Sequence, residues 1–375
     1  HLGGRSLQWG RQSYRWSDID FNANKKEGIS IDWPVRYKDI APWYSKVEDY
    51  IGVSGEALNL PQLPDSDFLP MMELNCVEQH FKEKVAENFD GRVVTAGRTA
   101  HITGTKQFDG RSKCQFRNRC IRGCPFGAYF SSLSSTLPAA EATGNMTLRP
   151  DSIVHEVMYD PNTKKATGVK VIDRVTKETF EFKAKVIFLC ASAIASTSIL
   201  MQSKSDTFPN GMGNESDQLG RNIMDHHLGV GASGKFDGFE DNYYKGRKPS
   251  GIYIPRFRNL GGKSEMPGYK RGFGWGLPTV TFDAEFKENE WKMREDMKQS
   301  AVDMLTKAGL RDVTPYDNPG ALGLGIHEMG TARMGRDRKT SVLNGNNQLH
   351  DVPNVYVTDG SFMTSANYVN PSLTY

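Results

Sequence analysis

The stretch that indicates the fold class is Lys185-Val-Ile-Phe-Leu-Cys-Ala-Ser-Ala-Ile-Ala-Ser-Thr-Ser198. Its first half is β-branched and apolar, which is typical of a buried strand, and its second half leads through small residues into an apolar run. A buried strand that turns directly into a helix places backbone N–H groups at the helix start, where anionic groups bind well. The stretch therefore predicts an α/β fold with a ligand beside this turn.

The segments on either side predict further strands and helices. Strands are expected at 146–157, 169–173 and 179–182, because turn sequences separate these three runs, and they form a β-meander. Apolar residues at three- and four-residue steps predict a helix over 37–52, and another is expected over 77–88. The charged stretch 285–308 is predicted to be helical, with a solvated face rather than a binding role.

A second, sheet-based domain is expected from about Leu228 to Pro319. This part is rich in aromatic residues and glycine. It alternates apolar and polar residues in Gly251-Ile-Tyr-Ile-Pro255 and Leu277-Pro-Thr-Val-Thr-Phe282.

Composition limits the classes of function. With 375 residues, 38% of them hydrophobic, the chain can bury a substantial core in two or three domains. Its 47 basic and 44 acidic residues give a net charge of only +3, which disfavours nucleic acid and suits small or neutral substrates. No apolar run approaches the roughly 20 residues that cross a bilayer. Because the chain opens at His1 rather than Met, we expect a fragment of a longer protein.

Chemically versatile residues gather near the C-terminus. Gly325-Ile-His327-Glu-Met-Gly-Thr-Ala-Arg-Met-Gly335 is followed by a strand-like run that ends in Asp359-Gly360, and then by Asn370-Pro371. The C-terminal end of a buried strand is where open α/β sheets present ligands. From the residues alone, His327 is equally well interpreted as a hydrogen-bonded structural histidine or as a functional one.

The order of these motifs resembles that of the glucose-methanol-choline (GMC) family of flavoprotein oxidoreductases. The resemblance runs along nearly the whole chain in five matches. They are the Gly-Gly-x-Ser loop in 1–11, the helix from Ala41-Pro-Trp-Tyr to Val53-Ser-Gly, the strand and turn at 186–198, Leu219-Gly-Arg-Asn-Ile-Met-Asp225-His226, and the His-x-x-Gly-Thr-x-Arg-Met-Gly signature with the Asp-Gly and Asn-Pro elements after it.

This resemblance implies an FAD enzyme in which a substrate hydroxyl loses its proton while the carbon-bound hydride passes to the flavin. His327 is then the base, because an amide cannot accept a proton near neutral pH, and Asn370 anchors the alcohol oxygen. The expected FAD contacts are Gly3, Gly4, Ser6, Trp9, Gly10, Val154, Ala191, Ser192, Asp359, Gly360, Pro371 and Thr374.

Two departures from the family pattern qualify the expectation. The amino-terminal Gly-x-Gly-x-x-Gly unit is missing, so the Rossmann-like FAD-binding domain is expected to be incomplete. Gln8 stands where some relatives link a histidine covalently to the flavin, so FAD is expected to be non-covalent. We assign 1–30, 125–228 and 320–375 to the FAD domain, 31–124 to a cap region, and 229–319 to an antiparallel-sheet substrate domain.

Cys114, Cys120 and Cys124 form a tight loop that ends in Cys-Pro. Three thiolates suit an iron–sulfur cluster, and the loop resembles one in multi-subunit sugar dehydrogenases. Zinc needs a fourth ligand, for which His101 or Cys76 is the nearest candidate. The alternative is three reduced cysteines in a basic loop near a partner subunit.

The expected activity is therefore oxidation of a sugar or related alcohol by a dehydrogenase, with a possible small subunit and a cytochrome or quinone acceptor. The alternatives are an oxygen-using oxidase, an electron-transfer subunit with an iron–sulfur or zinc centre, and a sugar-binding relative without turnover. The family resemblance favours a periplasmic or partner-anchored location, and the cytoplasm is the alternative.

Overall fold

The centre of the molecule is a parallel pair of strands. The computed structural model describes residues 2–117, 119–227, 229–239, 251–273, 286–318 and 325–375. Strand β7 (Ile187–Leu189) pairs in parallel with β11 (Val355–Val357), and α5 (Ala193–Gln202) follows β7 after a short turn. The predicted strand, turn and helix are thereby confirmed, and Leu200, Val355 and Val357 are fully buried at their centre.

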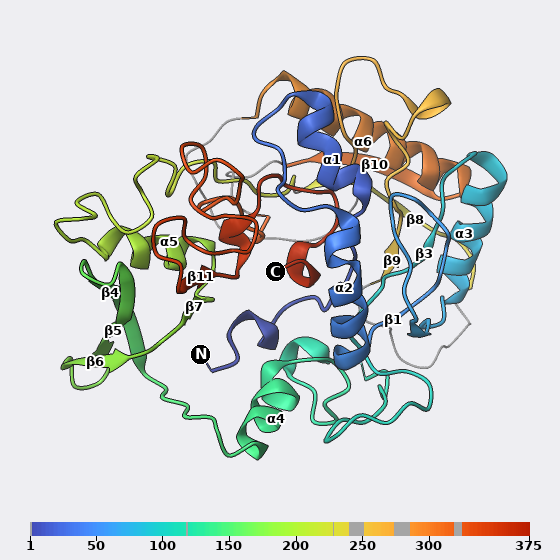
Figure 1. The fold of residues 1–375 in the computed structure, drawn as a ribbon. Helices are drawn as coiled ribbons and strands as arrows, with labels where there is room; N and C mark the ends of the chain where they lie inside the picture. Colours follow the sequence, from blue (N-terminus) through green and yellow to red (C-terminus); the bar gives the residue numbers. More distant parts are fainter. Residues whose placement is uncertain (1, 118, 228, 240–250, 274–285, 319–324) are drawn as a thin grey trace.

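An antiparallel meander packs beside this pair, at the left of Figure 1. It consists of β4 (Ser152–Asp160), β5 (Lys165–Asp173) and β6 (Thr179–Lys183), in the order β4-β5-β6. The meander prediction is confirmed, but its first strand was placed too early, at Met146. Pro150 and the left-handed backbone of Asp151 (φ 54°) precede the strand, so extended pairing begins only at Ser152.

The N-terminal third wraps the main core with aromatic side chains. Helix α1 (Asp18–Glu27), which the sequence patterns did not predict, is followed by α2 (Tyr37–Ile51), which they did. Trp33 is fully buried against Trp16, Phe21 and Phe362. Its indole N–H donates to Ser365 Oγ at 2.8 Å, so the helical N-terminal region is tied to the C-terminal segment.

A second hydrophobic cluster gathers around α6 (Glu288–Lys307), a confirmed helix at the top of Figure 1. Strand β8 (Val230–Lys235) pairs with β10 (Arg311–Asp317) beside α6. Helix α3 (Cys76–Asn88) also packs against α6. The alternation at 251–255 yields β9 (Ile252–Tyr253), which pairs with β3 (Thr95–Ala96). The alternation at 277–282 lies outside the described residues.

Shorter elements complete the fold. Among the described residues, no helix combines the length and apolarity that a membrane span requires. The remaining elements are η1 (Gly4–Leu7), β1 (Ser54–Gly55), β2 (Leu69–Pro70), η2 (Cys120–Arg122), η3 (Ser132–Ser134), α4 (Thr136–Ala142), η4 (Gly262–Ser264), η5 (Gly360–Phe362) and η6 (Pro371–Leu373).

We expect Trp33→Ala to lower the free energy of unfolding by about 3–5 kcal/mol, because it opens a cavity in the core and leaves Ser365 without its donor. Chemical denaturation measures this loss. Trp43→Ala is the matched control, since Trp43 is 63% exposed and its removal should cost almost nothing. Equal losses in the two variants would contradict this description of the core.

Candidate active site

One cavity of about 450 Å³ brings together the two polar residues singled out near the C-terminus. His327 and Asn370 both line it. Its walls come from α1, from α6 and from the segments 223–227 and 364–370. This volume lies in the range of small-molecule sites.

The carboxylate of Asp225 fixes the backbone that carries His327. Its Oδ1 accepts the backbone N–H of His226 at 2.7 Å and that of His327 at 3.1 Å. Gly325 lies so close that a Cβ there would come within 2.3 Å of Asp225 Oδ1, so no larger residue fits. Met224 and Met329 add two backbone hydrogen bonds of 2.9 Å, and the two segments are thereby held together.

The imidazoles of His226 and His327 lie against each other. Their Nδ1 atoms are 3.2 Å apart, so one of the two donates to the other. Burial lowers the pKa of His327 to about 4, nearby Glu328 partly opposes this, and Arg5 lowers it further. Burial and the neighbouring His327 also lower the pKa of His226 well below its usual value. Both rings are therefore neutral at pH 7.

The N-terminal loop reaches this site through an ion pair. Arg5 donates to the Glu328 carboxylate at 2.8 Å and to the Ile326 carbonyl at 2.9 Å. The same loop contains Gly3, Gly4, Ser6, Trp9 and Gly10, which the family resemblance assigns to FAD. It is held by Ser6 Oγ, which bonds Ser132 Oγ at 3.1 Å, and by the Trp9 indole, which donates to the Phe130 carbonyl at 3.0 Å.

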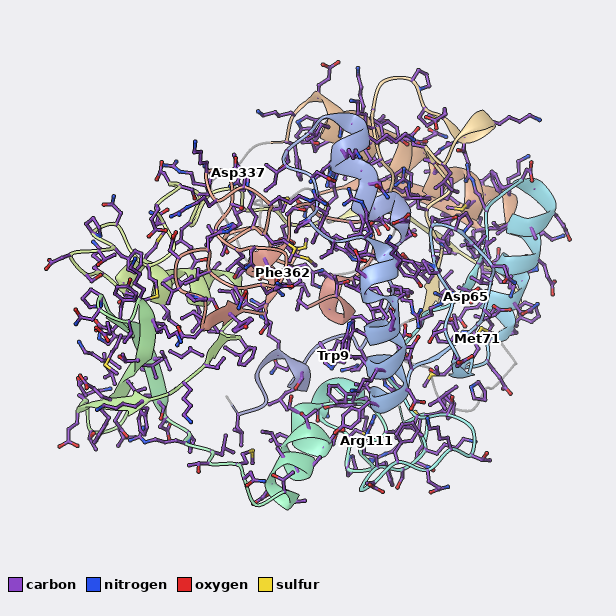
Figure 2. The ribbon with its side chains drawn as sticks, in the orientation of Figure 1. Trp9, Asp65, Met71, Arg111, Asp337 and Phe362 are labelled. Carbon is purple, nitrogen blue, oxygen red and sulfur yellow. The ribbon has the colours of Figure 1, made fainter. Side chains whose placement is uncertain are left out.

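The end of the chain meets the same loop. Leu373 in η6 packs in one small cluster with Trp9, which Figure 2 labels next to α2. Thr374 Oγ1 shares a 2.7 Å hydrogen bond with the Tyr44 hydroxyl on α2, and Pro371 is buried. The contact of Leu373 with the same cluster as Trp9 brings η6 next to the N-terminal loop.

Ala191, Ser192, Asp359 and Gly360 form a second group, at the carboxyl ends of β7 and β11. Thr358 N–H donates to the Leu189 carbonyl at 3.0 Å, which keeps the two strand ends side by side. Ser196 Oγ in α5 donates to the buried Asp359 carboxylate and accepts the Ala191 N–H at 3.1 Å. Val154 is on β4, which contacts α5, and it packs on the main core.

The cysteine loop surrounds a small space of its own. Cys114, Cys120, Cys124 and His101 line a void of about 30 Å³, and Cys120 Sγ lies 3.8 Å from His101 Nε2. Burial raises the pKa of both Cys114 and Cys120. In the part of the chain that the structure describes, no three His, Cys, Asp or Glu side chains are placed to hold a metal ion.

Sequence reasoning quoted Asp225 and His226 within a motif but gave them no role. The available signal was the stretch Met224-Asp-His-His227, in which two histidines directly follow a carboxylate. Sequence reasoning also passed over Asp20, Arg256 and Asn367, which line the same cavity. No spacing pattern links these three residues along the chain.

Comparison with known proteins identifies one family along most of the chain. Two models described as GMC oxidoreductase match residues 2–228 and 273–375. Three curated relatives align with 100% of this chain. They are 2-methyl-1,2-propanediol dehydrogenase of Mycolicibacterium austroafricanum (25% identical, 78% of its length), paromamine 6'-oxidase of Streptomyces fradiae (25%, 76%) and fructose dehydrogenase large subunit of Gluconobacter japonicus (24%, 78%).

Solved structures share the fold. A variant of formate oxidase from Aspergillus oryzae RIB40 superimposes with a TM-score of 0.60 at 12% identity, over 100% of this chain and 81% of that one. The arrangement of elements is therefore that of a known architecture.

The low pKa of His327 predicts a pH-dependent stability. Between pH 6.5 and about 4 the unfolded chain binds a proton at His327 that the folded chain does not, so stability falls as the pH falls through this window. At about pH 5 the stability lost through protonation of His327 in the unfolded chain amounts to about 1–2 kcal/mol. Denaturation at about pH 7.5 and about pH 5 should show a smaller acid loss for His327→Gln than for wild type.

His155→Gln, on the partly exposed strand β4, serves as the control and should retain the wild-type acid loss. An unchanged pH dependence in His327→Gln would show that the ring is not held neutral by burial.

Proposed function

Because the chain belongs to the GMC oxidoreductase family, an FAD-dependent family that oxidises the CH–OH group of alcohols, we propose that it oxidises a hydroxyl of a sugar or related polyol, with His327 as the base. The observation that carries the proposal is that His327 and Asn370 line one cavity of about 450 Å³. That cavity accommodates a ring-sized polar substrate.

The residues at the strand ends fit FAD. Ser192 at the start of α5 has a positive φ (83°) and makes no side-chain capping bond, so the first N–H groups of that helix are available to an anionic pyrophosphate. The Asp359 carboxylate lies next to them and suits a ribityl hydroxyl. No atom lies within 4 Å of the position that a Cβ of Gly4 would occupy, so the flavin ring can approach the backbone closely there. FAD, when bound, supplies the acceptor for the carbon-bound hydride.

His327 is suited to take the hydroxyl proton. Its ring is neutral at pH 7, which a base requires. We assign its Nδ1–H as the donor to His226 Nδ1, because this tautomer leaves the Nε2 lone pair of His327 free for the substrate. Asn370 then holds the alcohol oxygen with its amide, and the product is a carbonyl compound.

The electrons are proposed to leave to an acceptor other than oxygen, as in a dehydrogenase. The similarity to two dehydrogenases supports this assignment, whereas the similarity to paromamine 6'-oxidase supports the alternative of an oxidase. An iron–sulfur cluster at Cys114, Cys120 and Cys124 stays a prediction, and iron and sulfide analysis of the purified protein tests it.

We expect His327→Ala in the holoenzyme to retain yellow FAD but to slow substrate-driven flavin reduction by about 10²–10⁴-fold, because the base is lost. Anaerobic stopped-flow absorbance measures the rate. His350→Ala is the control, since His350 bonds Ser341 and does not line the cavity. Reduction at the wild-type rate in His327→Ala would refute the assignment.

The acceptor is tested by reoxidation of the substrate-reduced enzyme. A soluble quinone should restore the yellow absorbance at least about tenfold faster than air-saturated buffer does. Faster reoxidation by oxygen than by the quinone would place the protein with the oxidases.

A further inference from the structure

The cavity contains buried polar atoms whose hydrogen-bonding capacity the protein does not use. Thr364 Oγ1 is buried and has no hydrogen-bond partner among the described residues, and Thr364 lines the cavity. Asn367 lines the same cavity, with its side-chain amide beside the Asp20 carboxylate. A buried polar atom without a partner costs about 1–3 kcal/mol. Proteins rarely retain such atoms unless a ligand or water satisfies them.

Arg256, which also lines the cavity, is a buried cation without a matching carboxylate. It is 6% exposed, and no described acidic side chain lies within ion-pair distance of it. Its Nε and Nη2 donate to the carbonyls of Arg258 and Asn259, at 2.9 and 2.6 Å, and its Nη1 has no acceptor among the described residues. Gly272 packs flat against the guanidinium, since a Cβ there would come within 2.7 Å of Nε.

Asp20 brings the opposite charge to the same cavity. It is 6% exposed, its Oδ2 accepts the N–H and the Oγ–H of Ser17 at 2.7 and 2.6 Å, and the Asn367 amide also interacts with the carboxylate. Each carboxylate oxygen accepts more than one hydrogen bond, so Asp20 still has capacity for a donor from a ligand. Burial raises the pKa of Asp20, and the hydrogen bonds from Ser17 and the nearby Arg256 oppose that rise. Asp20 and Arg256 therefore influence each other without forming a direct ion pair.

A hydroxyl is the group that satisfies this arrangement, because it donates to a carboxylate and accepts from a guanidinium at the same time. A carboxylate or phosphate on the ligand would pair with Arg256 but would be repelled by Asp20. An ammonium group would have the reverse difficulty. The balance of charges thus selects a neutral ligand that carries several hydroxyls.

We propose that Asp20, Arg256, Thr364 and Asn367 form a subsite that binds the substrate hydroxyls that are not oxidised, and so select a neutral polyol or pyranose. This inference rests on the proposed function and deepens it by naming residues that determine specificity. A site built to bond hydroxyls rejects an analogue that lacks them, because its own buried groups are then left unpaired.

The test compares three classes of substrate with the holoenzyme: a panel of aldopyranoses led by glucose and galactose, the matching aldonates, and cyclohexanol, which presents a ring with one hydroxyl. Wild type should show kcat/KM at least about tenfold higher for one pyranose than for its aldonate or for cyclohexanol. Arg256→Met and Thr364→Val should each reduce the ratio of kcat/KM for pyranose over cyclohexanol, by about tenfold and severalfold respectively.

Thr364→Val tests binding with the least disturbance of the fold, because the hydroxyl it removes bonds nothing among the described residues. Thr197→Val is its matched control, since Thr197 is also buried with an unpartnered hydroxyl but does not line the cavity. A preference for the aldonate, or an unchanged ratio in both cavity variants, would overturn the subsite. Failure of every alcohol to reduce the flavin would instead refute the proposed function.

Discussion

The candidate active site depends on the hydrogen bonds that Asp225 accepts from the backbone of His226 and His327. A single carboxylate oxygen joins two segments that are about a hundred residues apart in sequence, and the absence of a side chain at Gly325 makes room for it. Because the carboxylate binds the backbone rather than the rings, it fixes where both imidazoles stand, and the two Nδ1 atoms are left to bond each other. Burial raises the pKa of Asp225, so these N–H donors are what keep its charge tolerable.

Two further contacts attach distant parts of the chain to this centre. Arg5 connects the glycine loop to Glu328, the residue after His327. Trp33 connects the N-terminal aromatic core to Ser365, in the segment that ends in Asn370. The site is thus assembled from both ends of the chain around a sheet of only two parallel strands. Each contact is polar and buried or partly buried. Loss of one partner leaves the other unsatisfied, and this penalty in free energy exceeds the net stabilisation that the contact provides.

The sequence predicted the elements whose pattern is local. The strand and helix at 185–202, the meander, and the helices at 37–51 and 76–88 follow from periodicity and turn residues. Helix α1 was missed because its apolar residues do not repeat at helical spacing, although Ser17 and Asp20 form a capping box at its start. The His226–His327 contact and the grouping of Asp20 with Arg256 were beyond reach, since only tertiary packing brings these side chains together.

The most direct test of the central claim is the pH dependence of kcat/KM for alcohol oxidation, which reports the protonation of the free enzyme. Because burial lowers the pKa of His327 to about 4, we expect a constant kcat/KM through the neutral range and a fall only as the pH approaches that value. A fall with an apparent pKa at or above 6.5, the ordinary value of histidine, would contradict the account.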